Sequence, residues 1–187
     1  GNETITGGDG ADTIDSEGGN DNIDAGAGND IIINSTAAFA TNLTAADTIA
    51  GGDGADTIRF THASAVDMVT NAANIANVSG IETLQLNAGG GQTLTINDLA
   101  LGVNNGTELT INANTNQTHT VVASGVLNNT ATINLTTSAG VTANTTYTVG
   151  NATDNVVFGG AQGTVNVTTG AFLSATDTIT GGSLATD

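Results

Sequence analysis

Acidic side chains recur every nine residues at the start of the chain, at Glu3, Asp12, Asp21 and Asp30. A glycine lies two positions before each acid and an isoleucine two positions after it, so three residue types keep one period. Carboxylate oxygens are preferred ligands of Ca²⁺, which accepts about 6–8 oxygens at about 2.3–2.6 Å. The regularly spaced acids are therefore candidate calcium ligands.

Each nine-residue unit is predicted to form a tight turn followed by a very short strand. Glycine permits the positive-φ conformations that such turns need, and the apolar isoleucine after the acid suits a strand. One unit buries a single isoleucine and cannot stand alone, so consecutive units must stack. Ile5 and Ile23 are then expected to point inward from one sheet, and Ile14 and Ile32 from the other.

Two such units form one coil, which places Asp12 and Asp30 on the same edge of the stack. Adjacent strands of a sheet lie about 4.8 Å apart. A carboxylate above and another below can bracket one ion, with turn carbonyls filling the remaining positions. The spacing therefore predicts a series of calcium sites along this edge. A flexible acidic linker is the alternative, and the three columns that keep register disfavour it.

The unit GGDGADTID at 7–15 resembles, at every specified position, the nonapeptide G-G-x-G-x-D-x-U-x of RTX proteins, a secreted and calcium-dependent bacterial family. The resemblance implies a right-handed parallel β-roll in which several Ca²⁺ ions lie between turns, held by the aspartate and by backbone carbonyls of the GGxGx turn. Carried over to this sequence, the implied ligands are Gly8, Asp9, Gly10, Asp12, Gly19, Asp21, Gly26, Gly28, Asp30, Gly52, Asp53, Gly54 and Asp56.

The repeats depart from the RTX motif at four positions. Ser16 and Glu17 replace the glycine pair, Ala25 replaces one glycine, and Glu3 replaces the aspartate. Glu17 carries a side-chain oxygen that can take the place of a turn carbonyl. The departures bear mainly on the sites at the start of the chain.

The motif is interrupted at 34–46, where a loop insertion is expected, with Phe39 covering the side of the stack. It resumes in ADTIAGGDGADTIRF at 46–60, where Asp47 and Asp56 are again nine residues apart. A second group of calcium sites is predicted here. Arg59 follows the strand and is expected to point outward and pair with a neighbouring acid.

Residues 61–80 are predicted to form a connecting or capping segment, compatible with a short helix. His62 is expected to be a polar surface or strand-edge residue, with a metal ligand as the alternative, since no second His or Cys lies nearby. The stretch VSGIETLQL at 78–86 resembles a segment of bacterial surface-layer proteins that are secreted with RTX repeats. Glu82 within it is either an exposed acid or a calcium ligand outside the repeats, together with Asp67.

From residue 93 onward, apolar residues alternate with threonine and asparagine, which is typical of strands. An antiparallel sandwich and a wider solenoid both fit this pattern, and the RTX-like start and the stacking of Thr and Asn favour the solenoid. Asp154 and Asp177 keep the order acid-x-apolar and are further candidate calcium ligands.

The predicted fold is all-β, with a β-roll over 1–60 that continues into a wider Thr/Asn-rich β-solenoid with degenerate repeats over 81–187. Because the sequence begins and ends within repeat-like stretches, a fragment of a longer chain is expected.

Composition narrows the expected function. The chain has 18 acidic residues against one basic residue, for a net charge of −17. This charge disfavours nucleic acid and anionic membranes as partners, because both are bound through basic patches. The acids repel one another without counter-ions, so the repeats are predicted to be loose without calcium and ordered with it. The sequence contains no H-E-x-x-H or G-x-S-x-G motif and no cysteine, so an enzyme is not expected.

Two classes of binding or structural function remain. The first is a calcium-dependent structural protein of a bacterial surface layer, secreted to the cell surface, whose partners are copies of itself and whose contact with cell-surface polysaccharide lies in an unseen anchoring region. The second is an RTX adhesin, or a secretion and folding module of a larger secreted protein. A calcium-stabilised extracellular fibre is a related alternative, because a solenoid without caps exposes edge strands.

Overall fold

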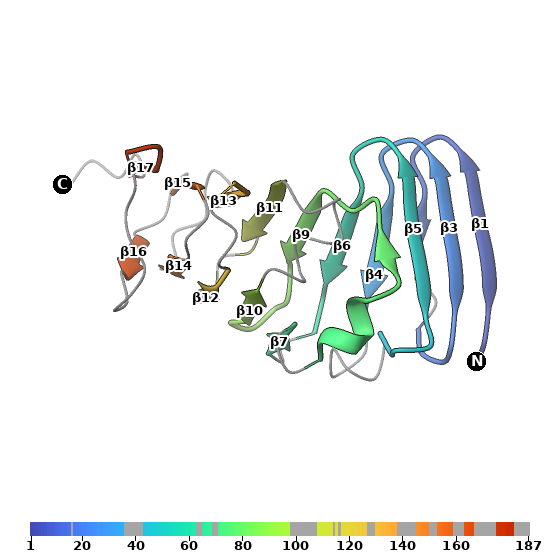
Figure 1. Cartoon of the computed structure of the whole chain (residues 1–187). Coiled ribbons are helices and arrows are strands. Elements are labelled where there is room, and N and C mark those ends of the chain that lie inside the picture. Colours follow the sequence, from blue (N-terminus) through green and yellow to red (C-terminus); the bar gives the residue numbers. More distant parts are fainter. Residues whose placement is uncertain are drawn as a thin grey trace.

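The computed structural model describes residues 1–15, 17–35, 43–62, 65–68, 71–97, 108–113, 115, 117–126, 130–137, 145–149, 153–158, 163–166 and 175–181. These residues form a coil of short parallel strands that advances from residue 1 at one end to residue 181 at the other (Figure 1). The predicted all-β, right-handed parallel β-solenoid is confirmed, and the antiparallel sandwich is excluded, because every strand pair among the described residues is parallel.

One eight-stranded sheet runs along the whole coil. Its strands, from the N-terminal end, are β2 (Thr13–Ile14), β4 (Ile31–Asn34), β6 (Thr57–Phe60), β9 (Thr83–Leu86), β11 (Glu108–Ala113), β13 (Thr132–Thr137), β15 (Thr153–Val157) and β17 (Thr178–Thr180). We refer to it as the long sheet. Each circuit of the chain adds one strand to it, so the long sheet sets the register of all the coils.

Two shorter sheets share the other side of the coil. The first contains β1 (Thr4–Asp9), β3 (Asn22–Ala27), β5 (Thr48–Asp53) and β8 (Val78–Ser79). The second contains β7 (Val66–Asp67), β10 (Thr93–Asn97), β12 (His119–Gly125), β14 (Thr145–Thr148) and β16 (Gly163–Asn166). Between β7 and β8 lies the 3-10 helix η1 (Ala72–Ile75), so the chain changes sheets within this one wide coil. No described helix is long and apolar enough to cross a membrane.

Coil length changes after the first repeats. Thr13 pairs with Ile31, and Ile31 with Thr57, so the second step along the long sheet takes more residues than the first. The extra residues belong to the expected insertion at 34–46, of which residues 36–42, including Phe39, lie outside the described part of the chain. The register on both sides of the insertion is kept, because Ile32 pairs with Ile58 and Ile23 with Ile49.

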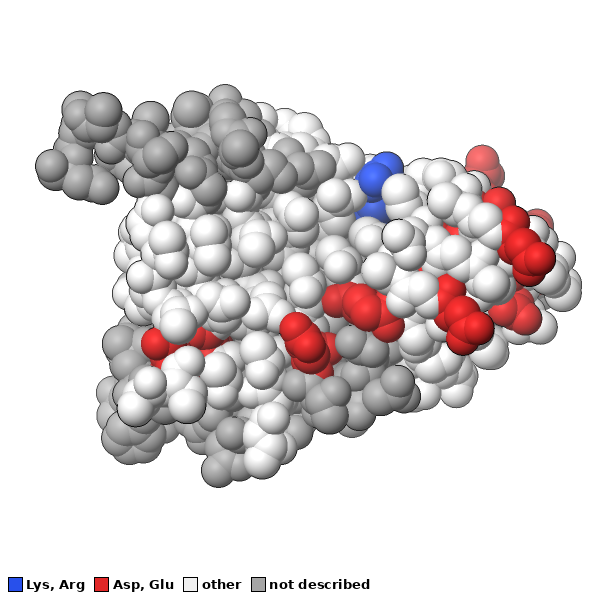
Figure 2. Space-filling model, turned by 90° about the horizontal axis from the view of Figure 1, so that it is seen from above, with Lys and Arg blue, Asp and Glu red and all other residues white. Residues whose placement is uncertain are grey.

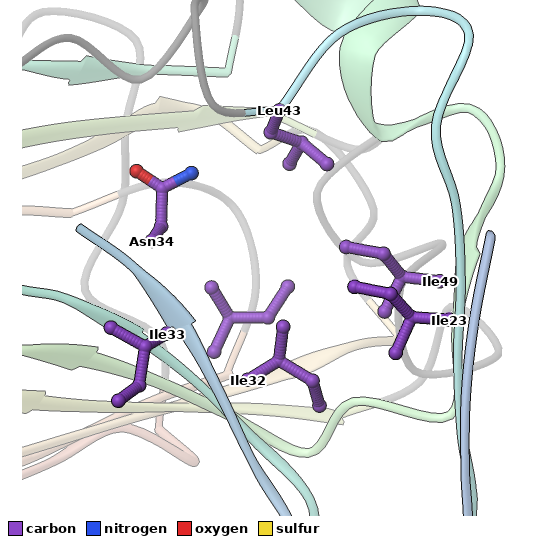
Figure 3. Close-up of a pocket in the computed structure, with 7 residues that line it drawn as sticks. Ile23, Ile32, Ile33, Asn34, Leu43 and Ile49 are labelled. Atoms are coloured by element: carbon purple, nitrogen blue, oxygen red, sulfur yellow. The ribbon is translucent and has the colours of Figure 1, made fainter. Parts of the chain in front are cut away.

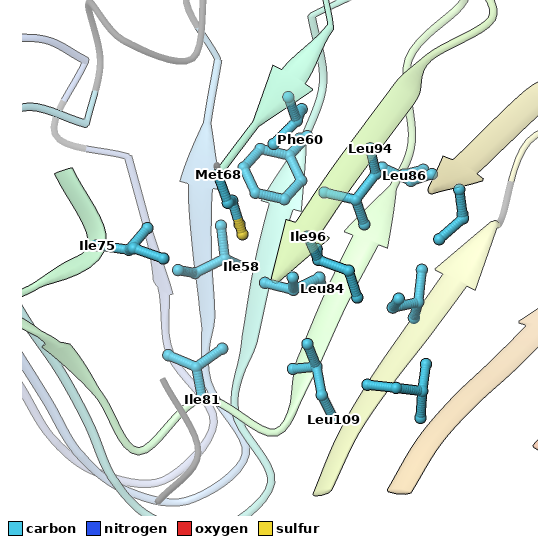
Figure 4. Close-up of a cluster of buried hydrophobic side chains, with 14 of the residues drawn as sticks. Ile58, Phe60, Met68, Ile75, Ile81, Leu84, Leu86, Leu94, Ile96 and Leu109 are labelled. Atoms are coloured by element: carbon cyan, nitrogen blue, oxygen red, sulfur yellow. The ribbon is translucent and has the colours of Figure 1, made fainter. Parts of the chain in front are cut away.

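A single column of aliphatic side chains runs through the core along the long sheet. Its members pair in register from strand to strand and are Ile14, Ile32, Ile58, Leu84, Ile111, Leu135, Val156 and Ile179. All but Ile179 are buried. Strand alternation explains the column, since every second residue of a strand faces the same side. Phe60, Met68, Leu94 and Ile96 pack against its central part (Figure 4).

The outer face of the long sheet carries polar side chains that hydrogen bond to each other from coil to coil. Asn155 donates from its amide to Asn134 Oδ1 over 3.1 Å, and Thr178 donates to Asn155 Oδ1. Asn134 in turn donates to Glu108 Oε1 over 2.6 Å. Arg59 donates to the amide oxygen of Gln85, so its described partner is a neutral side chain rather than the acid that we expected. The outer face is therefore a hydrogen-bonded ladder.

The core of the first coils is closely filled. A small cavity of about 10 Å³ lies between Ile23, Ile32, Ile49, Ile58 and Leu43, with Asn34 at its rim (Figure 3). A cavity needs roughly 10–15 Å³ of this kind of volume to hold one water molecule. This cavity is therefore too small for an organic ligand.

Gln92 links three segments of the chain inside the solenoid. Its amide donates to the carbonyls of Phe60 and His62 over 3.3 and 2.8 Å, and its Oε1 accepts the backbone N–H of Ala88. Its own N–H donates to His119 Nδ1. Gln92 is 1% exposed, so these groups have little access to water.

Both histidines are buried, which corrects the expectation of a surface position for His62. His62 lies against the edge of Phe60 with the ring planes at 74°, and it is 6% exposed. Burial lowers the pKa of His62 and of His119, because desolvation penalises the charged imidazolium. The histidines are therefore interior groups that close the coil.

Replacement of Gln92 by alanine is predicted to be strongly destabilising. It would leave the carbonyl of His62 and the N–H of Ala88 without this partner in the interior, and each such buried group costs about 1–3 kcal/mol, whereas the Phe60 carbonyl still accepts the N–H of Asn87. Gln85→Ala is the matched control, because Gln85 lies half-buried on the outer face and its amide oxygen has one described partner. Denaturant unfolding in calcium should show a larger loss of unfolding free energy for Gln92→Ala. Equal losses in the two variants would contradict the bridging role.

Candidate metal centre

Four acids stack on the turn that leads from the first short sheet to the long sheet. In each pair, the carboxylate of one acid accepts the backbone N–H of the acid one coil before it. Asp12 donates to Asp30 Oδ1 over 2.8 Å, Asp30 to Asp56 Oδ1 over 2.8 Å, and Asp56 to Glu82 Oε2 over 2.7 Å. We call these four residues the first carboxylate column.

A second carboxylate column lies on the turn that returns from the long sheet to the first short sheet, and it consists of Glu3, Asp21 and Asp47. Glu3 donates its N–H to Asp21 Oδ1 over 2.9 Å, and Asp21 donates to Asp47 Oδ1 over 2.7 Å. The other oxygen of Asp47 accepts the N–H of Thr44. The predicted alignment of acids nine residues apart on alternate edges of the coil is thus present in the structure.

The first column contains buried carboxylate oxygens that accept no hydrogen bond from any described residue. These atoms are Oδ2 of Asp12, Asp30 and Asp56. Asp30 and Asp56 are 0% exposed. A buried polar atom without a partner is costly, and native structures usually supply one as a donor, a water or an ion. These oxygens therefore fit a bound cation.

The electrostatics of Asp56 point the same way. Burial raises the pKa of its carboxyl above the usual value, and the charges of Asp30 and Glu82 raise it further, while the hydrogen bond with the Asp30 backbone opposes the change. A cation at this position would oppose this rise of the pKa, because an opposite charge favours the ionised carboxylate. The column is thus arranged for a positive charge that the protein's side chains do not supply.

Turn carbonyls lie beside the same oxygens. A Cβ placed on Gly51 would lie 2.6 Å from Asp56 Oδ2 and 1.9 Å from the carbonyl oxygen of Gly80, and one placed on Gly7 would lie 2.6 Å from Asp12 Oδ2 and 2.3 Å from that of Ala25. A carboxylate oxygen and a carbonyl oxygen from the next coil thus face one point next to each glycine. The two oxygens of each pair are therefore close enough together for one Ca²⁺ to contact both.

Backbone oxygens must supply much of any coordination shell here. Within the described part of the chain, no three His, Cys, Asp or Glu side chains converge in a way that could hold a metal ion. An ion between two coils would therefore combine carboxylate oxygens with turn carbonyls. Calcium, which takes carbonyl and carboxylate oxygens in flexible geometry, is the metal suited to such a donor set.

The glycines predicted to form the turns stack on one another. Gly8, Gly26 and Gly52 pair in register, and these residues, together with Gly10, Gly19, Gly28 and Gly54, have positive φ. Glu17 is the one described residue other than glycine with positive φ, at 62°, and its side chain is exposed. Gly52 shows why glycine is needed, because a Cβ there would lie 1.8 Å from the carbonyl oxygen of Gly26.

The side chains of Asp9 and Asp53 face solvent at the tips of these turns. Within the stack, the backbone carbonyl of Asp53 accepts the N–H of Gly28 over 2.8 Å. Seen from above, acidic side chains gather toward the end of the molecule that the first strands form (Figure 2). The carboxylates of Asp9 and Asp53 therefore add to the surface charge.

Asp154 and Asp177 form a further pair outside the repeats. Asp154 donates its N–H to Asp177 Oδ1 over 3.0 Å, as in the two columns, and it is fully buried. The hydroxyl of Tyr147 donates to Asp154 Oδ1. The pKa of Tyr147 is raised by burial and then by the charge of Asp154. Sequence spacing alone did not indicate that Tyr147 belongs to this pair.

Glu82 belongs to the first column although it lies outside the repeats. The sequence allows either an exposed acid or a calcium ligand together with Asp67 at this position; in the structure Glu82 is half-buried and stacks on Asp56, whereas Asp67 belongs to β7 of the second short sheet. The distance in sequence carried a signal, because Asp56 and Glu82 are 26 residues apart, as are Asp30 and Asp56.

Replacement of Gly52 by alanine is predicted to disrupt the turn of the first column. Gly52 has φ +103°, which an L-residue rarely adopts, and such strain costs about 1–3 kcal/mol before the contact with Gly26 is counted. Gly89→Ala is the control, since a Cβ there meets nothing within 4 Å. Calcium titration and denaturant unfolding should show weaker binding and lower stability for Gly52→Ala alone. Indistinguishable curves for the two variants would argue against the assigned turn geometry.

Comparison with known proteins agrees with this geometry. The family model of the RTX calcium-binding nonapeptide repeat matches residues 1–32 and 43–59 in 4 copies. Searches of curated proteins and of solved structures gave no significant match. RTX nonapeptide repeats bind Ca²⁺, and proteins that carry them are usually secreted. The matched segments contain the second column and all of the first column except Glu82. The coils at the N-terminal end of the chain therefore carry RTX calcium-binding nonapeptide repeats.

Proposed function

We propose that this chain is a calcium-dependent structural protein of a bacterial surface layer. In this function Ca²⁺ rigidifies each protomer and bridges neighbouring copies into an extracellular lattice. The observation that carries the proposal is the first carboxylate column, in which buried carboxylate oxygens lie without a described hydrogen-bond donor beside turn carbonyls. An ion there stabilises only the folded coil, because the unfolded chain lacks the stacked turns.

Charge supports a folding switch between compartments. The net charge of −17 is concentrated toward the repeat end, where the acids repel each other when no cation is bound. In a cytosol poor in calcium the repeats stay loose enough for export. Outside the cell, millimolar calcium matches the weak affinities of extracellular calcium modules, which are about 10⁻⁴–10⁻³ M. The protein then folds and assembles only after secretion.

The remainder of the chain supports a structural role. The outer face of the long sheet consists largely of Thr, Asn and Gln that bond to each other, and the described cavity in the first coils is too small for an organic substrate. The chain contains no lysine and a single arginine, which leaves few sites for trypsin-like proteases on an exposed cell surface. We therefore propose a non-catalytic function.

The lattice partners are further copies of this chain. Asp9 and Asp53 place exposed carboxylates at the turn tips, where their side chains face solvent rather than the coil interior. Calcium between two such carboxylates from different protomers offsets their repulsion. Nucleic acid is disfavoured by the negative charge. Contact with cell-surface polysaccharide would belong to an anchoring region elsewhere in the protein.

An RTX adhesin, or a secretion and folding module of a larger secreted protein, is the second candidate. The same columns favour it, because calcium-driven folding outside the cell serves either function. A calcium-stabilised fibre is a variant, in which edge strands of successive molecules pair end to end. Assembly behaviour distinguishes these candidates from a surface layer.

Calcium is predicted to order the repeats through Asp12 and Asp30. The double variant Asp12→Asn/Asp30→Asn should raise the calcium concentration at half-maximal ordering roughly tenfold or more, since the charge of the ligands sets the affinity. Asp24→Asn is the control, because Asp24 is an exposed acid of β3 outside both columns. Circular dichroism during a calcium titration measures the midpoint. An unshifted midpoint in the double variant, or a wild-type spectrum unaffected by chelator, would refute the assignment.

Lattice formation is predicted to depend on calcium. Electron microscopy of the purified chain should show ordered two-dimensional arrays in millimolar calcium and none after chelation. Dispersed rods in calcium would favour the adhesin or folding module, and end-to-end filaments would favour the fibre. Both of these outcomes contradict the surface-layer proposal while leaving calcium-dependent folding intact.

A further inference from the structure

Glu82 continues the first carboxylate column beyond the repeats that the family model matches. The matched segments end at residue 59, yet Glu82 accepts the N–H of Asp56 over 2.7 Å, as Asp56 accepts that of Asp30 over 2.8 Å. In return, the N–H groups of Glu82 and Thr83 donate to the carbonyl of Asp56 over 3.1 and 3.0 Å. Glu82 therefore occupies the place of a repeat aspartate in the fourth coil.

The turn that carries Glu82 is shorter than the repeat turns below it. Ala50 pairs with Ser79 at the start of the turn, and Thr57 pairs with Thr83 at its end. The repeat turn from Gly51 to Asp56 has six residues, whereas the turn from Gly80 to Glu82 has three. Glutamate is one methylene longer than aspartate, and this extra length compensates for the shorter turn. The residue type thus fits the local backbone.

Two oxygens lie close to one point where these turns stack. Asp56 Oδ2 is buried, and no described residue donates a hydrogen bond to it. It lies 2.6 Å from the position that a Cβ on Gly51 would take, and the carbonyl oxygen of Gly80 lies 1.9 Å from the same position. Gly80 has positive φ, at 64°, like the glycines of the repeat turns, and it stacks on the backbone of Gly51 and Gly52.

We propose that Asp56, Gly80 and Glu82 form a terminal calcium site, half from the last repeat and half from a coil outside the repeats. Asp56 contributes Oδ2, Gly80 its carbonyl oxygen, and Glu82 the carboxylate that closes the site from the fourth coil. The inference rests on the calcium binding proposed for the repeat columns. It goes beyond the proposed function in one respect, because a single ion would join the repeat coils to the rest of the solenoid.

The consequence is mechanical coupling between the two parts of the chain. Glu82 directly precedes β9, a strand of the long sheet, and Gly80 directly follows β8, the last strand of the first short sheet. An ion held by Asp56, Gly80 and Glu82 therefore fixes the entry into the wider coils. Calcium-induced order in the repeats is then transmitted to β9, which pairs with β11.

The first test counts bound ions in the whole chain. Isothermal titration with Ca²⁺ should give one ion fewer for Glu82→Gln than for the wild type, and the same loss for Glu82→Asp, whose shorter side chain does not span the gap. Asp24→Asn carries the same charge change as Glu82→Gln on an exposed strand position and should keep the wild-type number. An unchanged number of ions at unchanged affinity in both Glu82 variants overturns the site.

The second test follows the coupling by hydrogen exchange. In the wild type, calcium should protect the amides of both Ile31–Asn34 and Thr83–Leu86. In Glu82→Gln, protection should persist at Ile31–Asn34 and fall at least tenfold at Thr83–Leu86, which also distinguishes local loss from general misfolding. Equal protection of Thr83–Leu86 in variant and wild type counts against the coupling. If the wild type binds no calcium at all, both the calcium site at Glu82 and the function proposed for the repeats fail. If the wild type and Glu82→Gln bind the same number of ions with the same affinity, only the Glu82 site fails.

Discussion

The repeat region of this protein depends on one constraint, which is that like charges are stacked at the spacing between adjacent strands of a β-sheet. Two carboxylates one strand apart repel by about 3 kcal/mol at an effective dielectric constant near 20, and the first column aligns four of them. Backbone N–H groups offset part of this repulsion, because each donates a hydrogen bond to one oxygen of the next acid. The second oxygens of Asp12, Asp30 and Asp56 have no such donor among the described residues. A divalent cation is the component that balances the column.

The two halves of the solenoid hold adjacent coils together by different means. In the repeats, acids and turn carbonyls face each other at the edges of the coil. In the wider coils, neutral side chains such as Asn134, Asn155 and Thr178 bond to each other on the outer face of the long sheet. The aliphatic column runs through both halves. The fold is therefore continuous, while its dependence on metal is concentrated at one end.

Much of the repeat region could be predicted from sequence because its signals are local and periodic. Ile14 and Ile32 pair in register, and Asp12 stacks on Asp30, as the nine-residue period required. Glu82 was harder to place, because a shorter turn and a longer side chain changed the local motif while the register was kept. His62 and Gln92 were harder still, since their burial depends on contacts between coils that are far apart in sequence. Periodicity identifies residues that repeat, and it carries little information on single residues that close a wide coil.

The position of the calcium sites in the chain also bears on how the solenoid folds. Parallel sheets fold slowly because distant segments must meet before any contact stabilises them. The first repeat coil closes over only 18 residues, and each carboxylate contact there is one that a cation stabilises at once. The wider coils close over longer loops, such as the 27 residues from Leu84 to Ile111, and gain mainly neutral hydrogen bonds and apolar contacts, apart from the contact between Asp154 and Asp177. A metal-bound repeat block therefore provides a formed sheet edge on which β9 and then β11 add in turn, as expected for a solenoid whose coils contact only their neighbours.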